Sequence, residues 1–485
     1  MFPPITPFFV AMDEETFFPS DTDIDFSFTS TTSSVTTATD RTFASSSART
    51  SLARSSLTLS FNESRLSTST AGATAAANLH HRPHRKSDPH WSAINAATTL
   101  SSDGALHLRH LKLLRHLGTG NLGRVFLCRL RDCDAANFAL KVVDRDALTN
   151  KKLSHVQMEA DILSALDHPF LPTLYAHLEV SHYTCLLIDY CPGGDLHSLL
   201  RKQPGNRLPV DAVRFYAAEV LVALEYLHAT GVVYRDLKPE NVLLREDGHI
   251  MLSDFDLCFK ADVVPILESR ARTRPVHGCF GSREAAEEVV AEFVAEPTDA
   301  FSRSCVGTHE YLAPELVAGT GHGNGVDWWA FGVFIFEMLH GTTPFKGGSK
   351  EATLRNIAST RQVKFQARDE EEKGVGITEA RDLIERLLVK DPRKRLGFSR
   401  GATDIKRHPF FNGIKWPLIR TYTPPEVRGV ARKTKAHVSH VTGVPSERGH
   451  WWWNSKKNKG SKHNFTFNNN NYYSYINYKK VKKCA

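Results

Sequence analysis

Residues 234–241 read Tyr-Arg-Asp-Leu-Lys-Pro-Glu-Asn, and their charge pattern is the most specific signal in the chain. Asp236, Lys238 and Asn241 place a proton acceptor, a cation and an amide oxygen close together in sequence. An ordinary polar loop gives no reason for this combination. The pattern therefore indicates a site that handles a charged ligand together with a metal ion.

The residues that follow predict how a second metal ligand reaches this site. Residues 242–244 and 249–252 are apolar and flank the turn residues 247–248, which is a hairpin signal. Such a hairpin returns Asp254 to the side of Asn241. Oxygen ligands from two chain segments are what a magnesium ion bound to phosphates requires.

A glycine-rich stretch precedes this region by about a hundred residues and has the spacing Gly-x-Gly-x-x-Gly-x-Val. Glycines let backbone amides approach phosphate oxygens without obstruction. The stretch comprises Leu117, Gly118, Thr119, Gly120, Asn121, Leu122, Gly123, Arg124 and Val125. Alone it is a weak signal, because dinucleotide folds and plain turns contain similar strings. The strand-like residues that follow it speak against a dinucleotide fold.

Lys141 and Glu159 are a candidate pair between strand and helix. Residues 138–143 alternate as a strand does, which places Ala139 and Lys141 on one face. Glu159 lies in residues 153–163, whose apolar positions have helical spacing. A lysine on a buried strand is costly unless an anion meets it. The alternatives are an edge lysine that reaches solvent and an ordinary surface glutamate.

The order of predicted elements indicates an α+β fold. Strand patterns dominate early, whereas residues 209–231 form a long amphipathic helix with Pro209 near its start and Gly231 at its end. Residues 328–339 predict a buried core helix that is too short to span a bilayer. We therefore expect two lobes, a small one built on an antiparallel sheet and a larger helical one.

Composition sets the limits of the ordered part. The chain has 485 residues, of which 41% are hydrophobic, and residues 1–108 are rich in Ser, Thr and Ala, which predicts a disordered leader. Residues 431–485 predict a disordered tail. Residues 428–485 carry 13 Lys or Arg and one acid, so of the net charge of +8 this stretch holds +12 and the remainder −4. Eight cysteines without a Cys-x-x-Cys pair favour an intracellular, reducing compartment.

Taken together, the motifs over residues 111–411 resemble the protein kinase family, which uses ATP and Mg²⁺. The resemblance implies that Asp236 accepts the proton of the attacking hydroxyl and that Lys238 neutralises charge on the transferred phosphoryl group. Lys141 would hold the α- and β-phosphates, supported by Glu159. The ligands of Mg²⁺ would be Asn241 and Asp254.

The resemblance also implies an adenine pocket and a structural frame. Glycine-stretch residues Leu117 to Val125 would cover the nucleotide. The remaining adenine and hinge residues would be Ala139, Asp189, Cys191 and Leu243. Leu163, Leu174, Tyr234 and Phe255 would stack as an internal spine, although ordinary core positions explain these apolar residues equally well. Arg395 is placed to pair with Glu315.

Within the family the chain resembles the AGC group, whose C-terminal extension would be residues 412–430. Residues 304–315 look like an AGC activation segment. Ser304 would then be the activating phosphosite, paired with Arg235. Thr308 would contact the catalytic residues and mark a Ser/Thr kinase. The residues that would read arginine upstream of the target are Glu240 and Glu337.

Two departures from the common kinase pattern indicate a narrower group within the family. The usual Asp-Phe-Gly motif is Asp-Phe-Asp at residues 254–256, and the activation segment carries an insertion over about 258–301. This insertion is first basic and then acidic in sequence. Both features resemble plant-specific AGC VIII kinases, and the leader and tail are most similar to the WAG and PINOID branch. That branch is associated with phosphorylation of PIN auxin efflux carriers at the plasma membrane.

Partners and location follow as expectations. Protein substrates with basic residues near the target are expected, whereas nucleic acid is not, since residues 1–427 lack a basic excess. The polybasic tail, with Trp451–Trp453, predicts attachment to an anionic lipid surface at the plasma membrane. A solubilising tail in the cytoplasm or a nuclear-import tail is the alternative.

Two questions of regulation and catalysis stay open in the sequence. The chain ends Lys-Lys-Cys-Ala without the Phe-x-x-Phe motif that docks the upstream phosphoinositide-dependent kinase. Autophosphorylation at Ser304 is therefore as plausible as activation by that partner. A pseudokinase that only binds nucleotide is the alternative to an active enzyme, and only Asp256 favours it.

Overall fold

The N-terminal lobe is built on one antiparallel sheet. The computed structural model describes residues 88–131, 133–277, 283–365 and 376–429. Five strands pair in the order β1-β2-β3-β5-β4. Their bounds are Leu111–Thr119, Arg124–Leu130, Cys133–Asp144, Tyr183–Asp189 and Leu174–Val180, in the same order. The expected strand over 138–143 lies within β3, so this prediction is confirmed.

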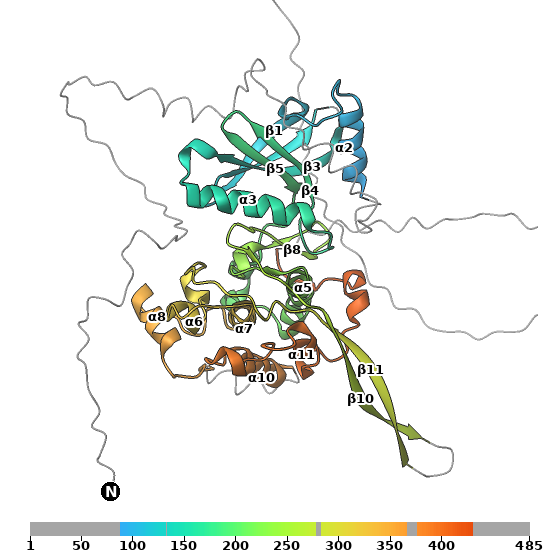
Figure 1. Ribbon diagram of the computed structural model, residues 1–485, viewed down its shortest axis with the longest axis vertical. Helices are drawn as coiled ribbons and strands as arrows, with labels where there is room; N and C mark the ends of the chain where they lie inside the picture. The colour runs from blue at the N-terminus through green and yellow to red at the C-terminus, as the bar shows by residue number, and fades with distance from the viewer. Residues whose placement is uncertain (1–87, 132, 278–282, 366–375, 430–485) are drawn as a thin grey trace, which may run out of the picture. The chain divides into compact units, whose positions relative to one another are not determined.

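A single long helix, α3 (Asn150–Ala165), lies against this sheet (Figure 1). The side chain of Thr149 caps its N-terminus by accepting a hydrogen bond from the Lys152 amide. Val156, Ala160 and Leu163 are buried, as the helical spacing predicts. Glu159 is buried on the same helix, so it is not the ordinary surface glutamate of the alternative interpretation.

Order begins earlier than composition predicts. Helix α2 (Pro89–Thr99) is capped by the Asp88 side chain and buries Trp91 and Ile94 against β2 and β3. The expectation of disorder is therefore wrong for residues 88–108, and its remainder, 1–87, lies outside the described residues. A compositional average misses this helix, because two apolar side chains three positions apart are enough to dock one turn against an existing sheet.

The C-terminal lobe is helical and surrounds α7 (Gly325–His340), which is buried along almost its whole length. The expected core helix at 328–339 is thus confirmed. The neighbouring helices include α5 (Val210–Ala229) and α10 (Ile377–Leu387), which both contact α7. The other helices are α4 (Leu196–Arg201), α6 (Pro314–Val317), α8 (Lys350–Ala358) and α11 (Ala402–Lys406). The α+β fold with a sheet lobe and a helical lobe is confirmed.

Short elements complete the described fold. Two-stranded pairs join β6 (Val232–Val233) to β9 (Phe259–Lys260) and β7 (Val242–Leu244) to β8 (Ile250–Leu252). The second pair is the hairpin expected around residues 247–248. The 3-10 turns are Leu108–His110, Arg145–Ala147, Pro204–Asn206, Pro239–Asn241, His309–Tyr311, Pro392–Lys394, Pro409–Phe411 and Trp416–Thr421.

The expected insertion contains a long β-hairpin. Strands β10 (Ile266–His277) and β11 (Arg283–Val294) pair in antiparallel register and extend away from the helical lobe (Figure 1). Glu292, near the end of β11, forms ion pairs with Arg400 and Arg407, which flank α11. The hairpin is therefore attached at its base by charged contacts.

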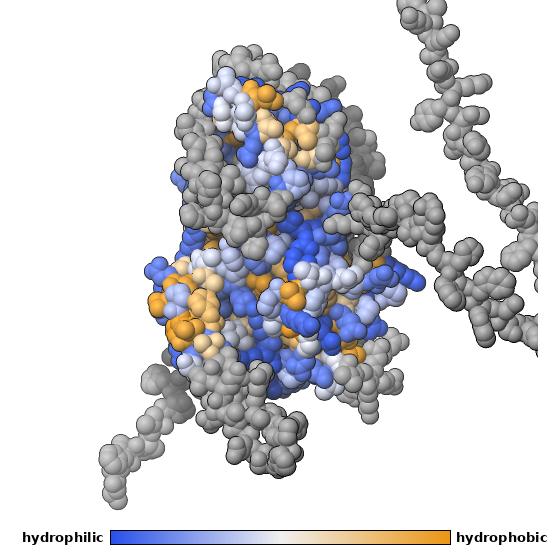
Figure 2. Space-filling view, turned by 90° about the vertical axis from the view of Figure 1, so that its right-hand side faces the viewer, coloured by the Kyte–Doolittle hydropathy of each residue, from blue (hydrophilic) through white to orange (hydrophobic). Residues whose placement is uncertain are grey.

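One face of the described residues is mostly polar (Figure 2). Figure 2 shows one face on which apolar side chains gather only in limited patches. No helix within the described ranges is both long enough and apolar enough to cross a bilayer.

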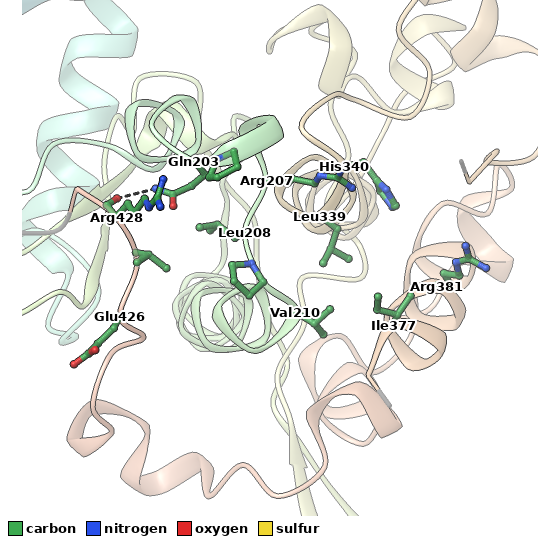
Figure 3. Close-up of a pocket in the computed structure, with 13 residues that line it drawn as sticks. Gln203, Arg207, Leu208, Val210, Leu339, His340, Ile377, Arg381, Glu426 and Arg428 are labelled. Carbon is green, nitrogen blue, oxygen red and sulfur yellow. Dashed lines mark hydrogen bonds between the residues drawn. The ribbon is translucent and has the colours of Figure 1, made fainter. Parts of the chain in front are cut away.

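A pocket of about 540 Å³ lies in the helical lobe, away from the predicted chemistry. It is formed where α5 begins, α7 ends and α10 begins, with residues 426–428 along one side (Figure 3). There the amide of Gln203 donates to the Arg428 carbonyl at 2.7 Å. None of the predicted catalytic or nucleotide-binding residues lines this pocket, so it plays no part in the site described next.

Candidate active site

The glycine stretch forms the turn between β1 and β2. The Gly120 amide donates to the Gly123 carbonyl at 2.9 Å and closes the turn. A Cβ atom at Gly123 would lie 2.3 Å from the Val142 carbonyl oxygen, whereas one at Gly120 would meet nothing within 4 Å. Gly123 is therefore required by the close approach of β3, and Gly120 leaves the space above the turn open to a ligand.

Lys141 and Glu159 form a buried ion pair between β3 and α3. The Nζ atom of Lys141 lies 2.7 Å from both Oε atoms of Glu159 and 3.4 Å from Oδ1 of Asp254. Burial by itself would lower the pKa of Lys141, but the carboxylates of Glu159 and Asp254 outweigh it and raise that pKa. The lysine therefore stays charged and contacts Asp254 as well as Glu159.

Asp236 lies at the centre of a hydrogen-bonded group in the loop after β6. Its Oδ2 atom accepts from Lys238 Nζ at 2.8 Å and from Asn241 Nδ2 at 2.9 Å. The Thr308 hydroxyl donates to Asp236 Oδ1 at 3.1 Å and accepts from Lys238 at 2.8 Å. Burial raises the pKa of Asp236, and the charge of Lys238 opposes that shift. The structure thus brings together the four residues that the sequence singles out.

The two predicted metal ligands come from the loop and from the end of the β7–β8 hairpin. The Ser253 amide donates to the Asn241 carbonyl at 2.9 Å, so Asp254 follows directly after this contact. Asp254 has φ +59, a left-handed conformation that is uncommon for residues other than glycine. An amide and a carboxylate are hard oxygen donors, which fits Mg²⁺ with phosphates as its further ligands.

Asp256 is buried close to these charges, with 4% of its surface exposed. Burial and the neighbouring charge of Asp254 raise its pKa to about 8, against the influence of Lys141. Its carboxyl group therefore holds its proton well above the pH range in which an ordinary aspartate ionises.

The side chains of the predicted adenine and hinge residues have different surroundings. Ala139 is buried, and Cys191 Sγ lies 3.9 Å from Met251 Sδ on β8, a residue that the sequence analysis did not single out. Asp189, by contrast, accepts from the Thr173 amide at 2.7 Å and from the Tyr175 hydroxyl at 3.1 Å. Its carboxylate therefore supports the β4–β5 region, and only its backbone is left to face a nucleotide.

The predicted internal supports are in place. Leu163, Leu174, Tyr234 and Phe255 are all buried, and the rings of Tyr234 and Phe255 are 5.5 Å apart. The guanidinium group of Arg395 contacts both carboxylate oxygens of Glu315 at 2.7 and 3.0 Å. The expected pairing of Arg395 and Glu315 is confirmed.

In the unphosphorylated activation segment Arg235 contacts Ser302, and its pairing with a phosphate on Ser304 stays a prediction. Arg235 donates to the Ser302 hydroxyl at 3.2 Å and to the Leu257 carbonyl at 2.6 Å, and its guanidinium lies over the Phe259 ring. The Ser304 amide also donates to the Ser302 hydroxyl, at 3.2 Å. In this unphosphorylated chain Ser302 thus separates Arg235 from Ser304, whose side chain is exposed.

The two acids expected to read a substrate lie near each other. Glu240 is exposed and contacts His197 at 3.1 Å, whereas Glu337 accepts a hydrogen bond from the Tyr311 hydroxyl. Burial raises the pKa of Glu337, and the nearby charge of Glu240 raises it further, while the bond from Tyr311 opposes both. A cationic side chain between the two acids would relieve their repulsion.

Comparison with known proteins agrees with this geometry. The model of the protein kinase domain matches residues 111–274 and 289–411. The chain belongs to the protein kinase family. The residues between the two matched parts, 275–288, run from the end of β10 into the first half of β11, whereas the base of the hairpin lies within the matched parts.

The relatives define the group. The serine/threonine-protein kinase WAG1 of Arabidopsis thaliana is 66% identical over 476 residues, covering 94% of this chain and 98% of the relative. WAG2 of the same plant is 63% identical over 490 residues, covering 96% and 98%. Protein kinase PINOID 2 of Oryza sativa subsp. japonica is 45% identical over 425 residues, covering 73% and 85%. This kinase is therefore a serine/threonine protein kinase of the plant AGC VIII type, in the WAG and PINOID group.

Sequence reasoning missed one part of the site. It did not single out Asp327, His228 or Glu296 as members of one polar group. The structure joins these three residues beneath the catalytic loop. No local motif reveals such a group, because His228 is 99 positions from Asp327 and 68 positions from Glu296 in the chain.

Proposed function

We propose that this kinase transfers the γ-phosphate of ATP to serine or threonine hydroxyls on plasma-membrane PIN auxin efflux carriers and thereby regulates polar auxin transport. Membership in the WAG and PINOID group supports the choice of substrate. The arrangement around Asp236 is the observation that carries the chemistry, because a buried carboxylate there meets a lysine, an amide and a hydroxyl at once.

Each residue has a defined task in this proposal. Lys141, held by Glu159, binds the α- and β-phosphates. Asp236 orients the substrate hydroxyl and accepts its proton, while Lys238 offsets the negative charge of the phosphoryl group in transfer. Bound Mg²⁺ would neutralise phosphate charge, and the side chains that would hold it are those of Asn241 and Asp254.

The catalytic part of the proposal is tested with purified protein, Mg²⁺-ATP and a peptide with arginine upstream of serine. Wild type should phosphorylate the peptide, and Asp236→Ala should lower kcat by roughly a thousandfold or more, because proton acceptance and orientation are lost together. No turnover by wild type, and no difference from Asp236→Ala, would leave the nucleotide-binding scaffold. Within the described residues no observation favours that scaffold.

The substrate is tested by phosphosite mapping on the cytoplasmic loop of a PIN carrier, with Lys141→Ala as the inactive control. We expect wild type to modify serines or threonines that have basic residues nearby. Glu240→Ala should lower kcat/KM for such sites more than for a peptide without arginine. Equal losses for both peptides would rule out Glu240 as the residue that reads the basic group.

Location at the inner face of the plasma membrane is a further part of the proposal. The polybasic tail, 431–485, lies outside the described residues, and its composition is the support for this part. Deletion of 431–485 should release the kinase from the membrane fraction of plant cells. Unchanged membrane association would refute a role of the tail, and loss of nuclear signal alone would favour the import alternative.

Activation through Ser304 completes the proposal. A phosphate on the exposed Ser304 would add about −1.5 to −2 charge next to the group formed by Ser302 and Arg235. Incubation of wild type and Lys141→Ala with ATP distinguishes the two routes. Phosphate on Ser304 of wild type alone indicates autophosphorylation, whereas phosphate on neither protein until an upstream kinase is added indicates the partner.

A further inference from the structure

A buried histidine connects the activation-segment insertion to the catalytic loop. His228 lies in the last turn of helix α5 and is fully buried. Its Nδ1 atom lies 2.7 Å from Oε2 of Glu296, just after β11, and its Nε2 atom lies 2.9 Å from Oδ2 of Asp327 on α7. The imidazole ring thus bridges two carboxylates that come from different parts of the fold.

The geometry determines the charge of this histidine. A carboxylate oxygen is an acceptor, so both ring nitrogens must carry a proton to bond to Glu296 and Asp327 at once. Burial opposes that charge, but Glu296 and Asp327 outweigh it and raise the pKa of His228 to about 10. His228 is therefore an imidazolium ion held between two acids, with the Trp328 ring 4.7 Å away as its apolar neighbour.

Asp327 passes this interaction on to the catalytic loop. Its Oδ2 atom accepts from the Tyr234 amide at 2.8 Å, and its Oδ1 atom accepts from the Arg235 amide at 2.7 Å. Arg235 has φ +68, a strained backbone conformation for a residue with a side chain. The next residue is Asp236, so Asp327 holds the backbone turn that presents the catalytic carboxylate.

The surroundings of Glu296 are built around its carboxylate. Asn324 Nδ2 donates to Glu296 Oε2 at 2.9 Å, and the Ala402 amide donates to Oε1 at 3.4 Å. A Cβ atom at Gly401 would lie 1.5 Å from Glu296 Oε1, so glycine is required where the carboxylate enters. A buried charge with these partners is costly to disturb, since removal of one member leaves the others unpaired.

We propose that Glu296 is a positioning residue for phosphoryl transfer, which acts through His228 and Asp327 on the loop that carries Asp236. The end of the insertion is then connected to the catalytic loop through Glu296, by way of one buried histidine. This inference rests on the proposed role of Asp236.

Glu292, near the end of β11, provides a matched control. It lies four residues before Glu296 and also anchors the hairpin, through Arg400 and Arg407, but these contacts are partly exposed and lead to α11. Partly exposed ion pairs contribute little to stability. If attachment of the hairpin were all that mattered, Glu292→Gln and Glu296→Gln would have similar effects.

The decisive experiment compares steady-state kinetics of wild type, Glu296→Gln and Glu292→Gln. Glutamine has nearly the shape of glutamate and can donate to a neutral His228, so the fold should persist. We expect Glu296→Gln to lower kcat roughly tenfold, with KM for ATP within about twofold, because a charge-assisted bond is replaced by a neutral one. Glu292→Gln should stay within about twofold in both constants.

A spectroscopic measurement distinguishes a role of Glu296 in the protonation of His228 from a purely structural role. NMR of histidine-labelled protein at pH 8 should show His228 doubly protonated in wild type and in Glu292→Gln, and neutral in Glu296→Gln. A neutral His228 in wild type would overturn the proposal. So would a Glu296→Gln enzyme with the kcat of wild type.

An inactive wild type or an unfolded variant would each have a cause other than failure of this inference, and each can be recognised. An inactive wild type would refute the proposed function itself, before the variants are compared. If Glu296→Gln unfolds below the assay temperature, Asn324→Ala removes one donor to Glu296 and keeps every charge. It should lower kcat in the same direction by a smaller factor, and an unchanged kcat in this folded variant would contradict the proposal.

Discussion

At the scale of single residues, Asp256 departs most from the common kinase pattern. It is buried near Asp254, Glu159 and Asp236, with Lys141 as the nearby cation. A fourth ionised carboxylate in this group would be unfavourable, and the raised pKa shows how the site avoids it. At neutral pH the Asp256 carboxyl is largely protonated, so it adds little charge next to the metal ligands.

This state predicts a pH-dependent effect of Asp256→Asn. The pKa of Asp256 is about 8 in the folded protein and 3.8 in the unfolded chain, so between these values the unfolded chain ionises while the folded protein keeps the proton, and stability falls as pH rises. Wild type should therefore lose stability relative to the variant from pH 6 to pH 8.5, with little further change above that range. Thermal unfolding without nucleotide or metal measures this difference, and a constant difference in Tm would contradict it.

Gly123 is a second residue whose environment makes a clear prediction. Gly123→Ala places a methyl group against the Val142 carbonyl, and the resulting displacement should destabilise the fold by about 1–3 kcal/mol. Gly120→Ala is the matched control, because nothing lies within 4 Å of its added Cβ. Chemical denaturation of the protein without nucleotide measures both. Equal stability of the two variants would show that β2 can move away from β3.

At the scale of elements, α2 extends the N-terminal lobe beyond the matched kinase domain. Trp91→Ala should destabilise the protein by about 3–5 kcal/mol, since a large aromatic side chain packed on Tyr175 is removed. Ser92→Ala, one position along on the exposed face, should leave stability unchanged within about 0.5 kcal/mol. If both variants unfold like wild type, α2 does not contribute to the stability of the sheet.

The insertion hairpin shows how far pattern reasoning reaches for an element. Its approximate bounds were predicted from the length of the activation segment, but not its secondary structure. Basic residues come first and acidic ones second, and the antiparallel register places Arg272 opposite Glu288. Neither run has the alternation of apolar residues by which strands are recognised in a sequence.

At the scale of the whole molecule, the site lies between two lobes that contribute separate groups. Lys141 from the sheet lobe and Asp254 from the helical lobe approach within 3.4 Å. A nucleotide bound between them stabilises the folded state by mass action, by about 2.7 kcal/mol at a hundred times its Kd. The rise in Tm on addition of nucleotide therefore measures binding. Comparison of variants in each lobe shows whether both lobes contribute to it.

This arrangement predicts a stabilisation that depends on Mg²⁺. ADP with Mg²⁺ should raise Tm of wild type more than ADP alone, because Asn241 and Asp254 would hold the metal ion and the metal ion would offset phosphate charge. Asp254→Asn should keep the shift from ADP alone and lose most of the increment from Mg²⁺. A full increment in Asp254→Asn would show that the metal is held by other groups.

Much of the site was predictable because its residues are coded by short motifs. Asp236, Lys238 and Asn241 lie within one loop, and the pairing of Lys141 with Glu159 follows from one strand and the next helix. Arg235 was harder, since its contact with Ser302 depends on how the activation segment folds back. Asp189 was assigned to the nucleotide, whereas the structure turns its carboxylate toward Tyr175 and Thr173.

Spacing along the chain was sufficient for the fold class, the lobes and the catalytic groups, because periodicity and motif geometry act over a few turns or strands. The contacts that connect Glu296, His228 and Asp327 follow only from the folded chain. A buried polar group needs a partner wherever the chain path brings one. That path depends on packing of the whole lobe, which no local pattern in the sequence encodes.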